Sequence, residues 1–276
     1  MKRRNFVRSL LVGGAGMMTH PVIKAAAPEK VSDIKPQTNV DEAKNIARTK
    51  DSMPGKYPGK VVRINHPESV VDGKPSETVA YYMLKASMLE LTGETDLKKA
   101  WLQFVGVEDI IGIKVNPIGG KLLSTSHAVT QSVVKQLLEA GIPVDRLVIW
   151  DRRQEGLEEA GFTPSAYPEI TFLSTECYDA DKSYINSDGS FYSEDRIDKA
   201  HSFYADIEGE YDAYTMPYML YGGKYPYFTK IFSCQFIKII NIPFFKNAGA
   251  SITPRLKNFA FASITTTGAP YSTPKP

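Results

Sequence analysis

The amino-acid sequence predicts an α/β fold built on a mostly parallel sheet with flanking helices. Two short, nearly continuous apolar runs, at residues 109–116 and 147–150, have the length and character of strands buried on both faces. Between them, residues 126–140 carry apolar side chains at helical spacing, with Thr125 or Ser126 as the cap and Gly141 as the stop. Strand, helix and strand in this order predict a right-handed, Rossmann-like parallel crossover. The expected buried stripe of the helix is Val129, Val133, Val134, Leu137 and Leu138.

Further elements are expected on both sides of this unit. Strands are expected at residues 61–64, 170–173 and 236–242, and a second helix at 78–91, before Gly93. Residues 178–230 are rich in Tyr, Asp, Ser and Gly and have weak periodicity, which predicts an insertion of hairpins and loops. Residues 60–276 are therefore expected to form a single α/β domain.

The charge distribution excludes two classes of protein. The chain has 276 residues, with 33 Lys plus Arg against 31 Asp plus Glu. Residues 1–27 hold five of the basic residues and no acidic ones, which leaves 28 basic against 31 acidic residues in the remainder. A mildly acidic body argues against a nucleic-acid binder that neutralises phosphates. No apolar run reaches the roughly 18–20 residues that cross a bilayer, so we expect a soluble globular domain without a membrane span.

The first 27 residues are predicted to be a signal peptide. Lys2-Arg3-Arg4 is followed by a short, weakly hydrophobic stretch and by the small residues Ala25 to Ala27. Residues 3–8 are similar to the twin-arginine export motif, which implies an exported, periplasmic or cell-envelope protein and the twin-arginine machinery as a partner. General secretion and a cytosolic amphipathic helix are the alternatives, the second disfavoured by Pro and Gly within the segment. Residues 28–59 are expected to be a linker or an extended arm.

Only two cysteines occur, Cys177 and Cys234, and no C-x-x-C motif is present. A cysteine-ligated iron–sulfur cluster or structural zinc site within this chain is therefore not expected, and no metal ligands are predicted. In an exported protein the two cysteines could form a disulfide, or they could be two buried thiols. The sequence leaves any other cofactor unknown.

Candidate site residues follow the predicted strands, because ligands in such sheets bind outside the carboxyl ends of the strands. These residues are Lys114 and Asn116 at the end of the first run, Asp151 and Arg152 at the end of the second, Lys246 after 236–242, and His66 after 61–64. The cations would form an anion clamp. Each has a structural alternative: Lys114 either pairs with Asp151 inside the fold or faces a ligand, Arg152 could lie in a solvated loop, and His66 could be a turn residue.

Several strings, in order, resemble the bacterial family catalogued as domain of unknown function 362. They are VVRINHP (61–67), LTG (91–93) before Ala100-Trp101, IGIKVN (111–116), STSHA (124–128), IWDR (149–152), AGF (160–162), IINIP (239–243) and LKN (256–258). The resemblance covers residues 60–268. It implies that Lys114, Asn116, Asp151, Arg152, Lys246, Thr253, Lys257 and Asn258 are the site residues.

Two departures from the family pattern are visible. Ala248 stands where relatives often have His, and relatives usually continue well past the position of Pro276. The resemblance thus implies that this chain stops early, with an unpaired sheet edge or an incomplete site. Some relatives carry ferredoxin-type clusters, which the two cysteines here do not allow.

Two functions are expected from these residues. The first is an exported enzyme acting on a small anionic or carbonyl-bearing substrate. In it Lys114 and Lys246 bind or polarise an oxyanion and Asp151 is the general base, oriented by Arg152. A desolvated lysine beside a second cation could also act as a base or form a Schiff base. The second is a non-catalytic exported protein that binds a ligand or a partner at the same strand ends.

Overall fold

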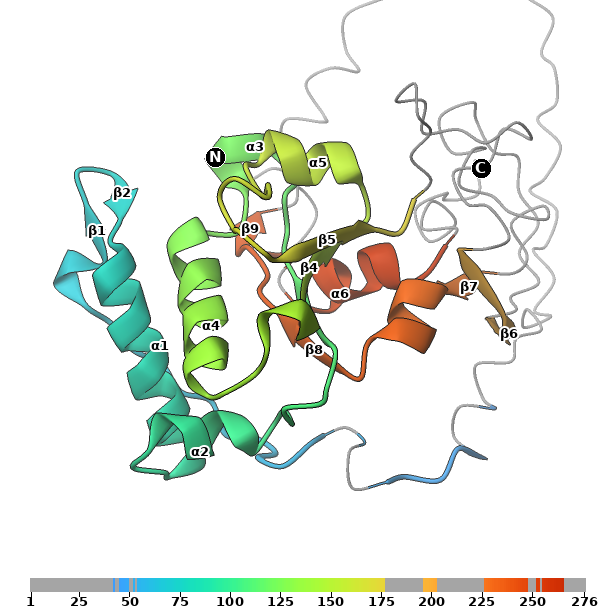
Figure 1. Ribbon diagram of the computed structural model, residues 1–276, viewed down its shortest axis with the longest axis horizontal. Helices are drawn as coiled ribbons and strands as arrows, with labels where there is room; N and C mark the ends of the chain where they lie inside the picture. The colour runs from blue at the N-terminus through green and yellow to red at the C-terminus, as the bar shows by residue number, and fades with distance from the viewer. Residues whose placement is uncertain are drawn as a thin grey trace, which may run out of the picture. The chain divides into compact units, whose positions relative to one another are not determined.

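The computed structural model describes residues 42, 45–49, 52, 54–176, 196–202, 226–247, 252–253 and 255–265 (Figure 1). All of them belong to one compact unit within residues 36–276. The predicted signal peptide, Cys177 and most of the predicted 178–230 insertion lie outside the described residues. Among the described helices, none is long and apolar enough to cross a membrane.

The centre of the fold is a four-stranded, all-parallel sheet, which confirms the predicted α/β class. Its strand order is β5-β4-β3-β8, with β3 at Ile111–Lys114, β4 at Leu147–Asp151, β5 at Thr171–Ser174 and β8 at Lys238–Asn241. All four overlap the predicted apolar runs. The first three strands follow one another toward one edge, and β8 then lies on the opposite side of β3. The strand order therefore reverses between β3 and β8.

Helices cover one face of this sheet. α4 (His127–Glu139) lies next to the sheet, and α1 (Glu77–Thr92) and α2 (Leu97–Leu102) pack against α4, with α1 and α4 side by side (Figure 1). Their apolar side chains pack with Ile111 and Ile113 of β3 and with Leu147 and Ile149 of β4. Because strand side chains alternate between faces, these four residues define the helix-covered side.

The ends of α1 follow simple capping chemistry. The hydroxyl of Ser76 accepts a hydrogen bond from the Val79 backbone N–H at 3.4 Å. At the other end Gly93 adopts a left-handed conformation, φ 76°, which glycine reaches without the strain of a Cβ atom. The prediction that Gly93 ends this helix is confirmed.

The opposite face of the sheet carries a second, smaller apolar cluster. Val148 and Trp150 of β4 pack there with the π-helical turn at Ile231–Gln235, with Phe236, and with Ala262 of α6 (Arg255–Ser263). The ring of Phe236 lies over Gly112 of β3, so closely that a Cβ atom on Gly112 would be 2.7 Å from Phe236 Cδ2. The central strand therefore needs glycine at this position.

The prediction of which α4 side chains are buried is partly wrong. Val129 and Leu138 are 36% and 41% exposed, whereas Thr130, Ser132 and Gln136 are buried. The reason is that α4 lies between the sheet and the α1–α2 pair, so it buries two faces rather than one stripe. The buried amide of Gln136 is satisfied because its Oε1 accepts from Trp101 Nε1 at 3.0 Å and its Nε2 donates to the Tyr81 carbonyl at 2.9 Å.

The predicted strand at residues 61–64 is also wrong. This segment has no regular structure, and Val61 is 75% exposed, so its β-branched side chains have no neighbouring strand to pack against. A hairpin forms downstream instead, from β1 (Val70–Val71) and β2 (Lys74–Pro75). Its turn residues Asp72 and Gly73 have φ 52° and 74°, as a two-residue Asp-Gly hairpin turn requires.

The remaining elements are short. They are α3 (Gly120–Leu123), α5 (Gln154–Glu159), β6 (Ile197–Ser202) paired antiparallel with β7 (Tyr227–Thr229), and β9 (Lys246–Asn247) paired antiparallel with β10 (Ile252–Thr253). Cys234 lies in the π-helical turn as an exposed free cysteine, so a buried position for it is excluded.

Candidate functional site

Lys114 and Asp151 form an ion pair at the carboxyl ends of the two central strands. The ammonium of Lys114, the last residue of β3, contacts Asp151 Oδ1 at the end of β4. The same Nζ donates to the Val115 carbonyl at 2.7 Å and to Asn258 Oδ1 at 3.4 Å, and it lies 5.6 Å from the centre of the Trp150 ring. The structure thus brings together three of the predicted site residues.

Burial changes the proton affinity of this lysine. Lys114 is wholly enclosed, and the loss of water around its ammonium lowers its pKa from the ordinary value, although the negative charge of Asp151 and its hydrogen bond oppose the shift. A lowered pKa means that the ammonium loses its proton more readily than an exposed lysine does. A lysine of this kind can exchange a proton with a neighbouring carboxylate or a substrate.

The polar contacts continue from Lys114 toward β8. Asn258 of α6 donates through Nδ2 to Asn241 Oδ1 at 2.8 Å, and Asn241 is the register partner of Lys114 on the adjacent strand. Asn241 was not among the predicted site residues, although its place at the end of a predicted strand could have indicated it. These contacts lie where the strand order reverses, the position at which doubly wound sheets bind ligands.

Hydrogen bonds of Thr125 connect the loop after β3 to the chain after β8. The Asn116 backbone N–H donates to Thr125 Oγ1 at 2.8 Å, and the Thr125 N–H donates to the Asn116 carbonyl at 2.9 Å. The Thr125 hydroxyl in turn donates to the Ile242 carbonyl at 2.7 Å, just after β8. Thr125, which the sequence suggested only as a helix cap, therefore ties the ends of β3 and β8 together. The Asn116 side chain accepts from the Ile118 N–H at 3.3 Å and so shapes the loop.

Arg152, which was predicted to orient Asp151, has a described ion pair with Glu176. Its Nε forms an ion pair with Glu176, a buried carboxylate that also pairs with Arg153 Nε at 3.2 Å. Burial raises the pKa of Glu176, and the two arginines oppose that shift. The guanidinium of Arg152 also lies 5.7 Å from the Phe261 ring, whose centre is 5.5 Å from Lys257 Nζ. Two predicted cations therefore meet at one aromatic ring.

The three remaining predicted residues are His66, Lys246 and Thr253. His66 is exposed in the turn before β1, where its Nδ1 accepts from the Glu68 N–H at 3.2 Å and caps a 3₁₀ turn at Pro67–Ser69. Lys246 and Thr253 face each other as backbone register partners in β9–β10, shortly after β8. The side chains of Lys246 and Thr253 lie outside the described residues.

Comparisons with known proteins add no relative. No protein-family model, curated protein or solved structure matches this chain.

The chemistry of the site therefore has to be argued from its geometry. The carboxyl edge of the sheet, defined by Lys114, Asp151, Asn241 and Asn258, combines a buried acid–base pair with two carboxamides. Such a set can donate to an oxyanion or a carbonyl oxygen and can move a proton. Within the described part of the chain, no group of three or more His, Cys, Asp or Glu side chains is arranged to hold a metal ion.

Proposed function

We propose that this protein is an exported enzyme that acts on a small anionic or carbonyl-bearing substrate, and that it belongs to the family catalogued as domain of unknown function 362. The observation that carries the proposal is the buried Lys114–Asp151 pair beside the strand-order reversal between β3 and β8. A buried ionisable group whose pKa is shifted, as that of Lys114 is lowered by burial, is often found at a catalytic site.

In the proposed reaction the Lys114 ammonium binds or polarises an oxygen of the substrate. Asp151, which accepts a hydrogen bond from that ammonium, is the general base that takes a proton from the substrate. Asn258 holds the Lys114 ammonium from the side of α6, so it is a positioning residue. Lys246 supplies a second cation from the hairpin that follows β8.

A non-catalytic binding protein is the second candidate. One observation favours it: Lys114 is fully enclosed in this conformation, so a substrate reaches Nζ only if the covering residues move. In this alternative the pair is structural, and the ligand contacts the more exposed cations Arg152 and Lys257 near Phe261.

The first experiment uses full-length protein purified from the cell envelope. Native mass spectrometry identifies any small molecule that the protein retains. Melting is then measured with sodium phosphate, sulfate, acetate, pyruvate and citrate at constant ionic strength. A retained anion or carbonyl compound, or a rise in Tm with one of these probes, supports binding at the site. No retained molecule and no shift with any probe would contradict both candidates.

Matched variants test the location and the chemistry. Asn258→Asp places a carboxylate beside Lys114 and is expected to abolish the probe's effect on Tm, whereas the exposed Asn65→Asp leaves it unchanged. A shift that survives Asn258→Asp contradicts the proposed location. The enzyme is distinguished from the binding protein by incubating the retained molecule with fresh protein and following it by ¹H NMR. Turnover that Asp151→Asn removes supports the enzyme, and binding without chemical change supports the alternative.

A further inference from the structure

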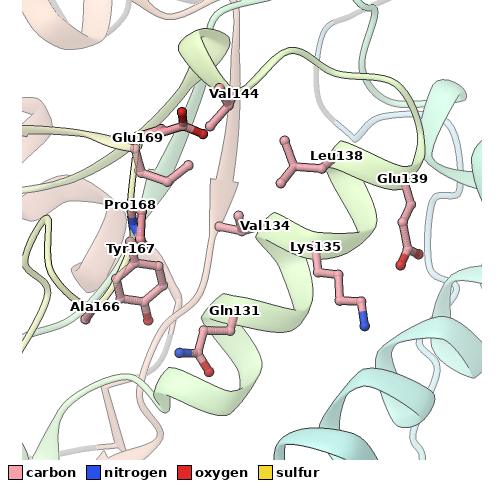
Figure 2. A pocket seen from close by; sticks show the side chains of 11 residues that line it. Gln131, Val134, Lys135, Leu138, Glu139, Val144, Ala166, Tyr167, Pro168 and Glu169 are labelled. Atoms are coloured by element: carbon pink, nitrogen blue, oxygen red, sulfur yellow. The ribbon is translucent and has the colours of Figure 1, made fainter.

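A cavity of about 580 Å³ lies beside α4, and none of the four residues that define the carboxyl edge of the sheet lines it. It is bounded by α4 on one side and by the chain at residues 166–170, which leads into the edge strand β5, on the other. Figure 2 shows Gln131, Val134 and Leu138 of α4 facing Tyr167, Pro168 and Glu169 across this space. Its volume is within the range of small-molecule sites.

The walls of the cavity are mostly apolar. Val134 and Leu138 come from α4, Val144 from the connection between α4 and β4, and Pro168 and Ile170 from the chain before β5. Leu138 lies outside the part of α4 that is buried between the sheet and α1, so its partial exposure is explained by its place in this wall. Lys135 and Glu139 also line the cavity but are engaged with α1: Lys135 Nζ is 4.8 Å from the Tyr81 ring, and the Tyr81 hydroxyl donates to Glu139.

One buried polar atom in the wall of the cavity, Gln131 Oε1, has no described hydrogen-bond donor. The Oε1 atom of Gln131 is shielded from solvent, and no group in the described part of the structure donates a hydrogen bond to it. The nearby Tyr167 hydroxyl is already bonded to His127 Nδ1 at 2.8 Å. Buried acceptors are normally satisfied, so an unpaired acceptor at the wall of an apolar cavity favours an occupant that brings its own donor.

We propose that this cavity binds a compact apolar molecule that carries one hydroxyl group. The hydroxyl donates to Gln131 Oε1, and the apolar body packs against Val134, Leu138 and Pro168. This site is independent of the proposed function, because it shares no residue with the carboxyl edge of the sheet.

The test compares benzyl alcohol with toluene, which has nearly the same shape but no donor. Binding to the full chain is measured by saturation-transfer NMR with titration. Benzyl alcohol is expected to bind about fivefold more tightly than toluene, because one typical net hydrogen bond changes the affinity by about this factor. Equal affinities, or no binding of either probe, would overturn the proposal.

Three variants identify the site. Gln131→Leu removes the acceptor and is expected to reduce benzyl alcohol binding to the level of toluene, while Leu138→Trp fills the cavity and reduces both. Gln154→Leu, a matched change on the surface of α5, should alter neither. Because Gln131 Oε1 lacks a protein donor, Gln131→Leu should keep or raise Tm without ligand. A lower Tm, or a preference for benzyl alcohol that survives Gln131→Leu, would assign Gln131 a structural role instead.

Discussion

The Asp151 carboxylate forms an ion pair with the Lys114 ammonium between two adjacent parallel strands. Asp151 directly follows Trp150, which is the register partner of Lys114. The two side chains are 7% and 1% exposed, so the pair is inside the protein rather than on its surface. A buried pair contributes little net stability when intact, because both charges have lost water. Removing one partner is costly, because the other charge is left buried alone.

Lys114→Met should therefore destabilise the protein by about 3–5 kcal/mol. Methionine keeps the apolar stem and a similar volume, so the loss comes from the charge left on Asp151. Adding Asp151→Asn should recover much of this loss, since the neutral amide needs no cation. Urea unfolding of the two single variants and the double variant measures the coupling free energy.

The exposed Lys121→Met is the control for this cycle and should change stability by less than about 0.5 kcal/mol. Additive losses in the double variant would show that Lys114 does not neutralise Asp151. If Lys114→Met leaves stability unchanged, Asp151 has another source of stabilisation, and the ion pair is of no structural importance.

The raised pKa of Glu176 predicts a pH-dependent contribution to stability. The folded protein holds the proton on Glu176 more tightly than the unfolded chain does, whose carboxyl group has an ordinary value of 4.5. In the window above pH 4.5, up to the raised pKa, the native state therefore binds more protons than the unfolded state. By linkage, the contribution of Glu176 to stability falls as pH rises through this window, by at most about 1.4 kcal/mol per pH unit.

The measurement is the difference in unfolding free energy between the wild type and Glu176→Gln, followed from pH 4.5 upward. Other titrating groups contribute equally to both proteins and cancel to first order. A difference that grows in favour of the wild type as pH rises would mean that Arg152 and Arg153 outweigh burial and hold the carboxyl group ionised.

Gly112→Ala should destabilise the protein by about 1–3 kcal/mol, because the new methyl group would overlap the Phe236 ring. The additional change Phe236→Leu should recover part of the loss. Gly156→Ala in α5 is a matched control: a Cβ atom there meets its nearest neighbour, Pro117 Cγ, at an ordinary 3.6 Å, so helix propensity should stabilise it by about 0.5–1 kcal/mol. Thermal and urea melts measure all three variants, and an unaffected Gly112→Ala would contradict the close contact.

The twin-arginine proposal predicts that Arg3→Lys with Arg4→Lys keeps the protein in the cytoplasm with its leader uncut. The paired arginines before Phe6 motivate this prediction. Cell fractionation with immunoblotting shows both the location and the size of the protein. Normal export and processing of the double variant would refute the twin-arginine route and leave general secretion as the alternative.

Local sequence patterns determined the main elements of the fold. The apolar runs that became β3 and β4 were recognisable because strands buried on both faces require continuous apolar side chains, and every residue of these two strands is buried. The runs that became β5 and β8 were also predicted as strands, although these two strands are only partly buried. The helix from Glu77 to Thr92 was recognisable from its spacing and from the glycine that ends it. Lys114 and Asp151 could be selected from the sequence because they stand at the carboxyl ends of such runs.

Only the tertiary structure decided which side chains meet. Asn258 joins Lys114 across 144 positions of the chain, and Arg152 pairs with Glu176 across 24 positions. Residues 61–64 have the composition of a strand but no strand beside them, and α4 buries polar residues because it is covered on two sides. The spacing of apolar residues in a segment indicates which of its side chains face the core and which face solvent. The partner of a buried polar group depends on which distant segment lies next to it, and that is set by the packing of the whole domain.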